Sequence, residues 1–179
     1  TVDIAAVATV RQGRQTFRYD PFGSEAFWGD QLQLHKAIAG AANGGVGGGL
    51  SPEAALKLGL KVDVDALPRS VKRALRAGTV DLTDPKTTLD LLRLGAVIGV
   101  TGFFDEQNRL KSVGIQCALC HSTTNDSFEQ GIGQRRDGWA NRDLNIGGIV
   151  ALAPRLDPLT QLLGVDDATA RAVLNSWGP

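Results

Sequence analysis

The first part of the chain carries apolar side chains at helical intervals. Ile4, Val7 and Val10 lie three residues apart, and this spacing predicts a helix over residues 3–17. A proline and a glycine follow at positions 21 and 23. Neither favours a continuing helix, so the first helix is expected to end before them.

A second helix is predicted to begin at Ser24, which is a good N-cap residue. Trp28, Leu32, His35 and Ile38 then fall on a single helical face. That face is apolar apart from the histidine. We therefore expect the imidazole of His35 to point into the interior.

Glycine and proline divide the middle of the chain. Residues 40–49 are mostly glycine, which predicts a flexible loop. Three short helices are predicted beyond this loop. Ser51 is the N-cap of the first ahead of a proline, Pro68 opens the second, Asp84 and a proline start the third, and a glycine ends each one. Their expected bounds are 51–59, 68–78 and 84–95.

The periodicity then changes from helical to alternating. Residues 96–104 are rich in valine, isoleucine and aromatic side chains, residues 110–116 alternate, and a polar turn separates the two. This pattern predicts a β-hairpin. Residues 122–143 are expected to be mostly loop. Further short helices are predicted over residues 144–177, and Asp166 is expected to cap the last of them.

Composition limits the possible partners. The 179 residues suit one domain, and 19 basic residues balance 19 acidic ones. The charge therefore indicates neither a nucleic acid nor an acidic membrane surface as partner. No apolar run is long enough for a transmembrane segment. The chain has two cysteines, two histidines and no methionine.

Both cysteines belong to the motif Cys117-Ala118-Leu119-Cys120-His121. Two thiols separated by two residues and followed at once by histidine form the pattern of covalent c-type haem attachment. Each thiol would add to a vinyl group of the porphyrin, and His121 would be the proximal iron ligand. The motif thus predicts one haem c, covalently bound through Cys117 and Cys120.

Two other interpretations of the motif stay open. Cys117, Cys120, His121 and His35 are of the types that bind zinc, although neighbouring residues such as Cys120 and His121 rarely converge on one tetrahedral ion. A thioredoxin-like redox pair is the other, but it belongs to a βαβ setting that the sequence lacks.

Because the chain has no methionine, His35 is the leading candidate for the sixth iron ligand. Methionine opposite histidine is the usual axial pair of a cytochrome c, and this chain does not contain one. His35 is the only histidine besides His121. A core histidine bonded to a backbone carbonyl is the alternative. The iron would then be five-coordinate, or ligated by lysine or by a residue of another segment or partner.

The stretch after the motif offers donors for the haem propionates. Buried carboxylates need such donors, and Arg135, Arg136, Arg142 and the indole N–H of Trp139 are candidates. The alternative is an ordinary surface loop. In that case Arg136 and Arg142 would each neutralise the aspartate that follows, at positions 137 and 143.

Four runs carry a family likeness: residues 13–20 (GRQTFRYD), 22–28 (FGSEAFW), 112–122 (SVGIQCALCHS) and 137–145 (DGWANRDLN). Together they resemble certain bacterial, exported cytochrome c proteins. The resemblance implies haem c bound by Cys117, Cys120 and His121, and a periplasmic location. In proteins of this type the polypeptide usually continues past the equivalent of Trp177, sometimes to another haem motif.

These observations predict a mainly α, cytochrome c-like haem domain over residues 1–179. It would have a large insertion at approximately 40–116 and one β-hairpin preceding the haem motif. We expect a periplasmic cytochrome, exported by a signal peptide that has been removed, which passes single electrons to or from a redox protein. A further haem domain or subunit is a possible partner. A peroxidase-like or oxidase-like haem enzyme with an open sixth site is the second interpretation.

Overall fold

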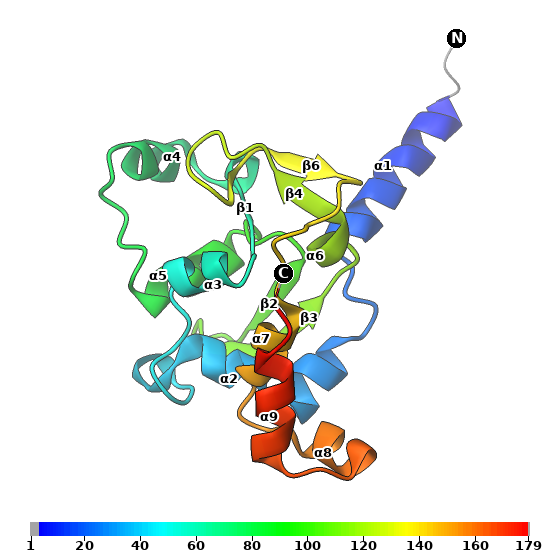
Figure 1. Ribbon diagram of the computed structural model, residues 1–179. Coiled ribbons are helices and arrows are strands. Elements are labelled where there is room, and N and C mark those ends of the chain that lie inside the picture. The colour runs from blue at the N-terminus through cyan, green and yellow to red at the C-terminus, as the bar shows by residue number, and fades with distance from the viewer. Residues whose placement is uncertain (1–3, 179) are drawn as a thin grey trace.

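The computed structural model describes residues 4–178, and helices predominate over strands in it (Figure 1). The helical elements are α1 (Ile4–Tyr19), the π-helix η1 (Ala26–Gln31), α2 (Leu34–Ala39), η2 (Ala41–Asn43), α3 (Pro52–Lys57), η3 (Val64–Ala66), α4 (Arg69–Arg76), α5 (Pro85–Arg93), α6 (Ala118–His121), α7 (Ile146–Ala151), α8 (Asp157–Leu163) and α9 (Asp167–Asn175). The strands are β1 (Val62–Asp63), β2 (Val100–Phe104), β3 (Leu110–Ile115), β4 (Ser122–Thr124), β5 (Ile132–Gly133) and β6 (Arg135–Asp137).

The fold is therefore a mixture of helices and short strands in which helices predominate. This agrees with the predicted fold class in its coarse form. The cytochrome c-like arrangement, with its insertion at 40–116, stays a prediction.

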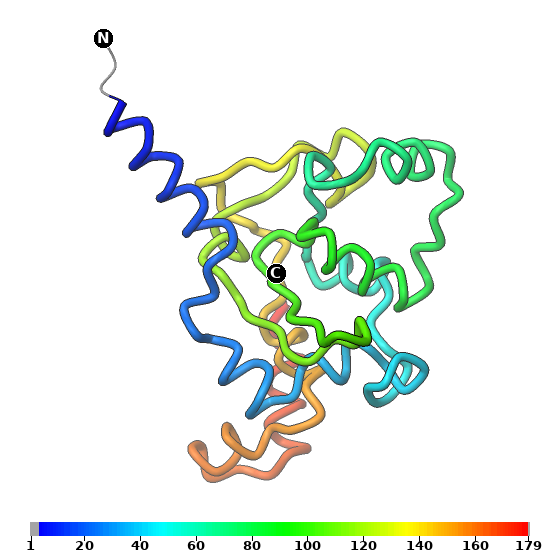
Figure 2. Tube along the Cα trace, turned by 180° about the vertical axis from the view of Figure 1, so that it is seen from behind, coloured from blue at the N-terminus to red at the C-terminus, as the bar shows by residue number. Residues whose placement is uncertain are grey.

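The first helix, α1, projects from the body of the molecule (Figures 1 and 2). It has no buried residue, and Ile4, Val7 and Val10 are all exposed. The predicted helix is confirmed over its described part, and Asp3 lies outside the described residues. No helix of the described chain combines the length and apolar character needed to cross a bilayer.

The predicted second helix is split in two. Its expected N-cap, Ser24, instead exchanges hydrogen bonds with Ile115: its Oγ accepts from Ile115 N at 2.9 Å and donates to Ile115 O at 3.0 Å. The chain then forms η1, and Gln33 adopts a left-handed conformation with φ 56° before α2 begins. The prediction of one continuous helix is wrong, because long-range bonds and this turn interrupt it. Trp28 and His35 thus belong to separate helical segments.

The hairpin before the motif is confirmed, with shorter strands than expected. β2 and β3 pair antiparallel, with Val100 opposite Ile115. Residues 122–143, expected to be mostly loop, contain three short strands: β4 pairs with β6, and β5 pairs in parallel with β1. Strands of two or three residues are too short to show a sequence period, which explains why they were missed.

Helix starts that depend on a local N-cap residue were predicted correctly. Ser51, Asp84 and Asp166 each accept a backbone N–H bond at the start of α3, α5 and α9. The predicted helices over residues 51–59, 68–78 and 84–95 are all present, as are helices within residues 144–177.

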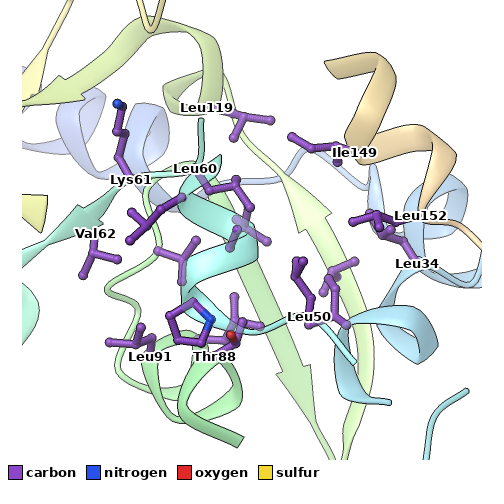
Figure 3. Close-up of a pocket in the computed structure, with 18 of the residues that line it drawn as sticks. Leu34, Leu50, Leu60, Lys61, Val62, Thr88, Leu91, Leu119, Ile149 and Leu152 are labelled. Atoms are coloured by element: carbon purple, nitrogen blue, oxygen red, sulfur yellow. The ribbon is translucent and has the colours of Figure 1, made fainter. Parts of the chain in front are cut away.

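The main core lies between the hairpin and the helices on either side of it. It contains a partly open pocket of about 50 Å³, lined almost entirely by aliphatic side chains. Leu119 of the motif lies on its wall, and the ammonium of Lys61 points away from it (Figure 3). The motif is therefore attached to the core through a side chain between its two cysteines.

Candidate functional site

The motif forms the one-turn helix α6 and its N-cap Cys117, and it contains both buried and exposed residues. Ala118 and Leu119 are 0% and 2% exposed, whereas Cys117, Cys120 and His121 are all exposed. Both thiols are free. Burying a leucine side chain contributes about 1.5–3 kcal/mol, so Leu119 holds the helix in this orientation. The three reactive side chains consequently face solvent together.

Gly99, which directly precedes β2, packs against the backbone of α6. Gln116 N donates to Gly99 O at 3.0 Å. A Cβ on Gly99 would lie 2.2 Å from both Cα and N of Leu119, and Gly99 has φ +79°. Only glycine permits this close approach with that backbone conformation.

A loop downstream of β6 closes the other end of α6. Gly138 N donates to His121 O and Asn141 N to Cys120 O, both at 2.9 Å. The Asn141 side-chain amide donates to Leu119 O at 3.3 Å. These bonds satisfy carbonyls at the C-terminal end of α6, which would otherwise lack partners. Asn141 was not among the predicted site residues, although it lies in the run 137–145 that carries the family likeness.

A cluster of Arg18, Asp137 and Arg135 lies beside the motif. The Asp137 carboxylate accepts from Arg18 Nε at 2.7 Å, from Arg135 Nε at 2.7 Å and from Ser122 Oγ at 3.1 Å. Ser122 directly follows His121. The cluster therefore connects the end of α1 to the residue next to the predicted iron ligand.

The charges of the cluster shift its ionisation. Burial alone raises the pKa of Asp137, but hydrogen bonds and charge from Arg18 and Arg135 outweigh it and the pKa lies below its usual value. Burial and the neighbouring Arg18 lower the pKa of Arg135, although Asp137 opposes both. Arg135 remains a cation at neutral pH because guanidinium does not lose its proton in proteins.

The predicted propionate donors are in different environments. The side chain of Arg135 is 4% exposed, whereas Arg136, Trp139 and Arg142 are all exposed. The predicted surface pairing of arginine with the following aspartate is not what the structure shows. Asp137 pairs with Arg18 and Arg135 because neighbouring residues of a strand point to opposite faces.

The aspartate at position 143 also has a distant partner. Asp143 pairs with Lys61, whose side chain is only 4% exposed, and not with Arg142. Asp143 O lies next to Gly59, where a Cβ would approach it to 2.0 Å. The stretch after Trp139 is therefore packed against the chain before β1.

His35 lies near Lys111 at the start of β3, whereas α6 follows the end of β3. It is half-buried in α2, and its environment includes Gly29, Lys36 and Lys111. Burial and the charge of Lys36 lower the pKa of its imidazole, although a hydrogen bond with the backbone of Gly29 opposes them. α2 and α6 lie apart in both views (Figures 1 and 2). The structure thus does not bring His35 and His121 together, and ligation by His35 stays a prediction.

The donor set fits covalent haem attachment. Two free, exposed thiols and an exposed imidazole are the groups that this chemistry requires. Nearby buried polar atoms also lack partners, namely Arg135 Nη2, Gln116 Oε1 and Asn141 Oδ1. Orphaned buried groups are rare in native proteins and indicate a missing partner such as a bound group or water.

The other two interpretations receive less support. No group of three or more histidine, cysteine, aspartate or glutamate side chains within residues 4–178 is placed to hold a metal, which disfavours the zinc site. The motif does follow a strand, but β3 and β4 belong to different antiparallel pairs. This is not the βαβ setting of a thioredoxin-like pair.

Comparison with protein-family models, curated proteins and solved structures finds no match. What the site can do is therefore inferred from its residues and their geometry.

Proposed function

We propose that the chain is an exported c-type cytochrome that transfers single electrons. Cys117 and Cys120 hold one haem c, and His121 is an iron ligand. The observation that carries this proposal is the division of α6, in which the two intervening residues are buried and all three reactive side chains are exposed. A surface arrangement of this kind leaves both thiols and the imidazole accessible to a planar group.

The attachment chemistry balances without a leaving group. Each thiol S–H adds across one vinyl C=C, so the sulfur forms a thioether and the proton goes to the other vinyl carbon. When bound, the haem supplies an iron that changes its oxidation state by one electron. The chain's own contribution is to present the thiols at a fixed spacing, to offer His121 as ligand and to keep α6 in place through Leu119 and Gly99.

The location and partners follow from the same chemistry. Covalent haem attachment takes place after export, which supports a periplasmic address. An electron donor or acceptor protein is the expected partner, and a further haem domain or subunit is the other. Ligation of the sixth position by His35 would give two imidazole ligands and a potential well below that of a histidine–methionine cytochrome.

The test is expression of the chain, with an export signal, together with haem-attachment machinery. We expect a Soret band, a c-type pyridine haemochrome spectrum and haem that remains with the polypeptide after denaturation. The matched control is the double variant Cys117→Ala/Cys120→Ala, which should retain no covalent haem. Absence of a Soret band in the unmodified chain would contradict the proposal.

A second candidate is a peroxidase-like or oxidase-like haem enzyme with an open sixth site. The separation of α6, which carries His121, from α2, which carries His35, favours it (Figure 1). Sharp α and β bands on reduction would support a six-coordinate electron carrier. A broad high-spin spectrum that shifts on adding cyanide would support the enzyme. His35→Ala should change a low-spin spectrum to high-spin if His35 is the ligand.

A further inference from the structure

The Arg18–Asp137–Arg135 cluster carries one more positive than negative charge. Arg18 and Arg135 share a single carboxylate, and that carboxylate also accepts from Ser122 Oγ. Its two oxygens are thus engaged by three side chains. Asp137 therefore leaves one guanidinium incompletely paired.

The incomplete pairing falls on Arg135. Its Nε bonds to Asp137 at 2.7 Å, but its Nη2 is buried and has no hydrogen-bond partner. The side chain is 4% exposed, so bulk water does not reach most of it. A buried charged donor without an acceptor is strongly unfavourable, which points to an acceptor that binds there.

We propose that Arg135 Nη2 binds a carboxylate, and that this carboxylate is one propionate of the haem. The inference rests on the proposed function, because the haem is the source of the carboxylate. An anionic acceptor fits best, since it would complete the hydrogen bonds of Arg135 and cancel the excess positive charge of the cluster. Charge-assisted bonds from arginine to carboxylate are also among the strongest in proteins.

The position of the cluster agrees with this assignment. Ser122 follows His121 directly and lies opposite Asp137 in the β4–β6 pair, and Thr124 lies opposite Arg135. The binding residue is thus on the strand that pairs with the continuation of the motif. Arg136 projects from the opposite face of β6 and is exposed. Among the predicted arginine donors, Arg135 alone combines burial with an unpaired N–H.

Asp137 is the residue that positions Arg135, and Arg18 binds the other oxygen of the same carboxylate. Arg18 lies on α1, with its Nη2 2.6 Å and its Nε 2.7 Å from Oδ2. Asp137 therefore orients Arg135 through Nε and holds the end of α1 at the same time. Both the orientation of Arg135 toward the propionate and the placement of α1 would therefore depend on the Asp137 carboxylate.

The experiment uses the haem-loaded protein and two conservative variants. Arg135→Lys keeps the positive charge and can still pair with Asp137, but it removes the planar fork and Nη2. Arg136→Lys is the matched control on the neighbouring, exposed position. Resonance Raman spectroscopy then reports the propionate bending band, which shifts when a hydrogen bond to the propionate is lost. We expect a shift in Arg135→Lys and none in Arg136→Lys.

A charge-removing pair supplies the second measurement. Arg135→Gln removes a buried cation beside the haem, so the more positive oxidised state becomes easier to reach and the midpoint potential falls. Arg136→Gln removes an exposed cation, whose effect is screened by water and salt. We therefore expect the larger fall in Arg135→Gln, and one that persists at high ionic strength.

The outcomes separate the two proposals. Suppose that haem is attached and that the propionate band is the same in Arg135→Lys and in the unmodified protein. This result would overturn the propionate assignment but would not contradict the proposed function. A propionate band shift of equal size in Arg136→Lys would also overturn the assignment. If the unmodified chain attaches no haem, the proposed function fails first. Should Arg135→Gln fold poorly, Arg135→Lys still decides the assignment.

Discussion

Gly99→Ala offers a direct test of how the hairpin positions the motif. The new Cβ would lie 2.2 Å from Cα and N of Leu119 and 2.5 Å from its Cβ. Backbone atoms cannot rotate away, so α6 or the hairpin must shift. We expect the variant to be less stable and to attach less haem.

The magnitude has two parts. A left-handed conformation costs an alanine about 1–2 kcal/mol relative to glycine. Overpacking against α6 adds about 1–3 kcal/mol. The total loss in the free energy of unfolding is therefore about 2–5 kcal/mol, from which a smaller entropy gain of about 0.4–1 kcal/mol in the unfolded chain is subtracted.

Gly78→Ala is the matched control. Gly78 has φ +64°, but a Cβ there meets nothing within 4 Å. It shares the backbone penalty and lacks the contact, so the difference between the two variants isolates the approach of Gly99 to Leu119. With a urea m-value of about 1–3 kcal/mol/M, that difference moves the unfolding midpoint by roughly 1 M.

Urea unfolding and the yield of covalent haem are measured for both variants. Gly99→Ala should show the lower midpoint and the lower yield. Equal midpoints and equal yields would refute the reasoning, because the close approach would then have no part in placing α6.

Three further predictions concern neighbouring contacts. In the haem-free chain, Leu119→Ala should lower the free energy of unfolding in urea by about 2–5 kcal/mol, whereas Cys120→Ala, at an exposed position, should change it by no more than about 0.5 kcal/mol; equal losses would contradict the burial of Leu119 between exposed neighbours. The pKa of Asp137 is lowered in the folded state, so its stabilisation is present above the ordinary aspartate pKa of about 4 and is lost as the pH falls through the lowered value. Asp137→Asn should therefore be less stable than the unmodified protein at pH 7 and lose less stability between pH 7 and about pH 3, and parallel pH profiles would count against the cluster. Asp143→Ala should lower the urea midpoint because it leaves the nearly buried ammonium of Lys61 unpaired; Lys61→Met in the same background should recover part of the loss, and no recovery would argue against the pair.

Contacts between near neighbours in the chain are visible in the sequence, whereas contacts between distant residues are not. Helix starts at Ser51, Asp84 and Asp166 were predictable because an N-cap bonds to backbone only two or three residues away. Ser24 has the same chemistry and was misassigned. Its hydroxyl bonds to Ile115, 91 residues along the chain, and no local pattern encodes that choice.

The candidate site shows the same division. The identity of the reactive groups was evident in the motif, since Cys117, Cys120 and His121 need no fold to be recognised. Which of the predicted arginine donors is buried could not be predicted, because strand β6 is too short to show its alternation. The available signal for the pair of Arg135 and Asp137 was their spacing, because residues two apart lie on the same face of a strand.

By itself, the sequence determined which reactive groups the motif contains, the hairpin before it and most helix boundaries. These depend on residue type and on neighbours within one or two turns. Only the tertiary structure decided that both thiols of the motif are exposed, that the helix of His35 lies apart from the helix of His121 and that Arg18 reaches Asp137 across 119 residues. Those outcomes depend on which distant surfaces pack together, and packing is settled by the burial of Leu119 and its neighbours in a shared core.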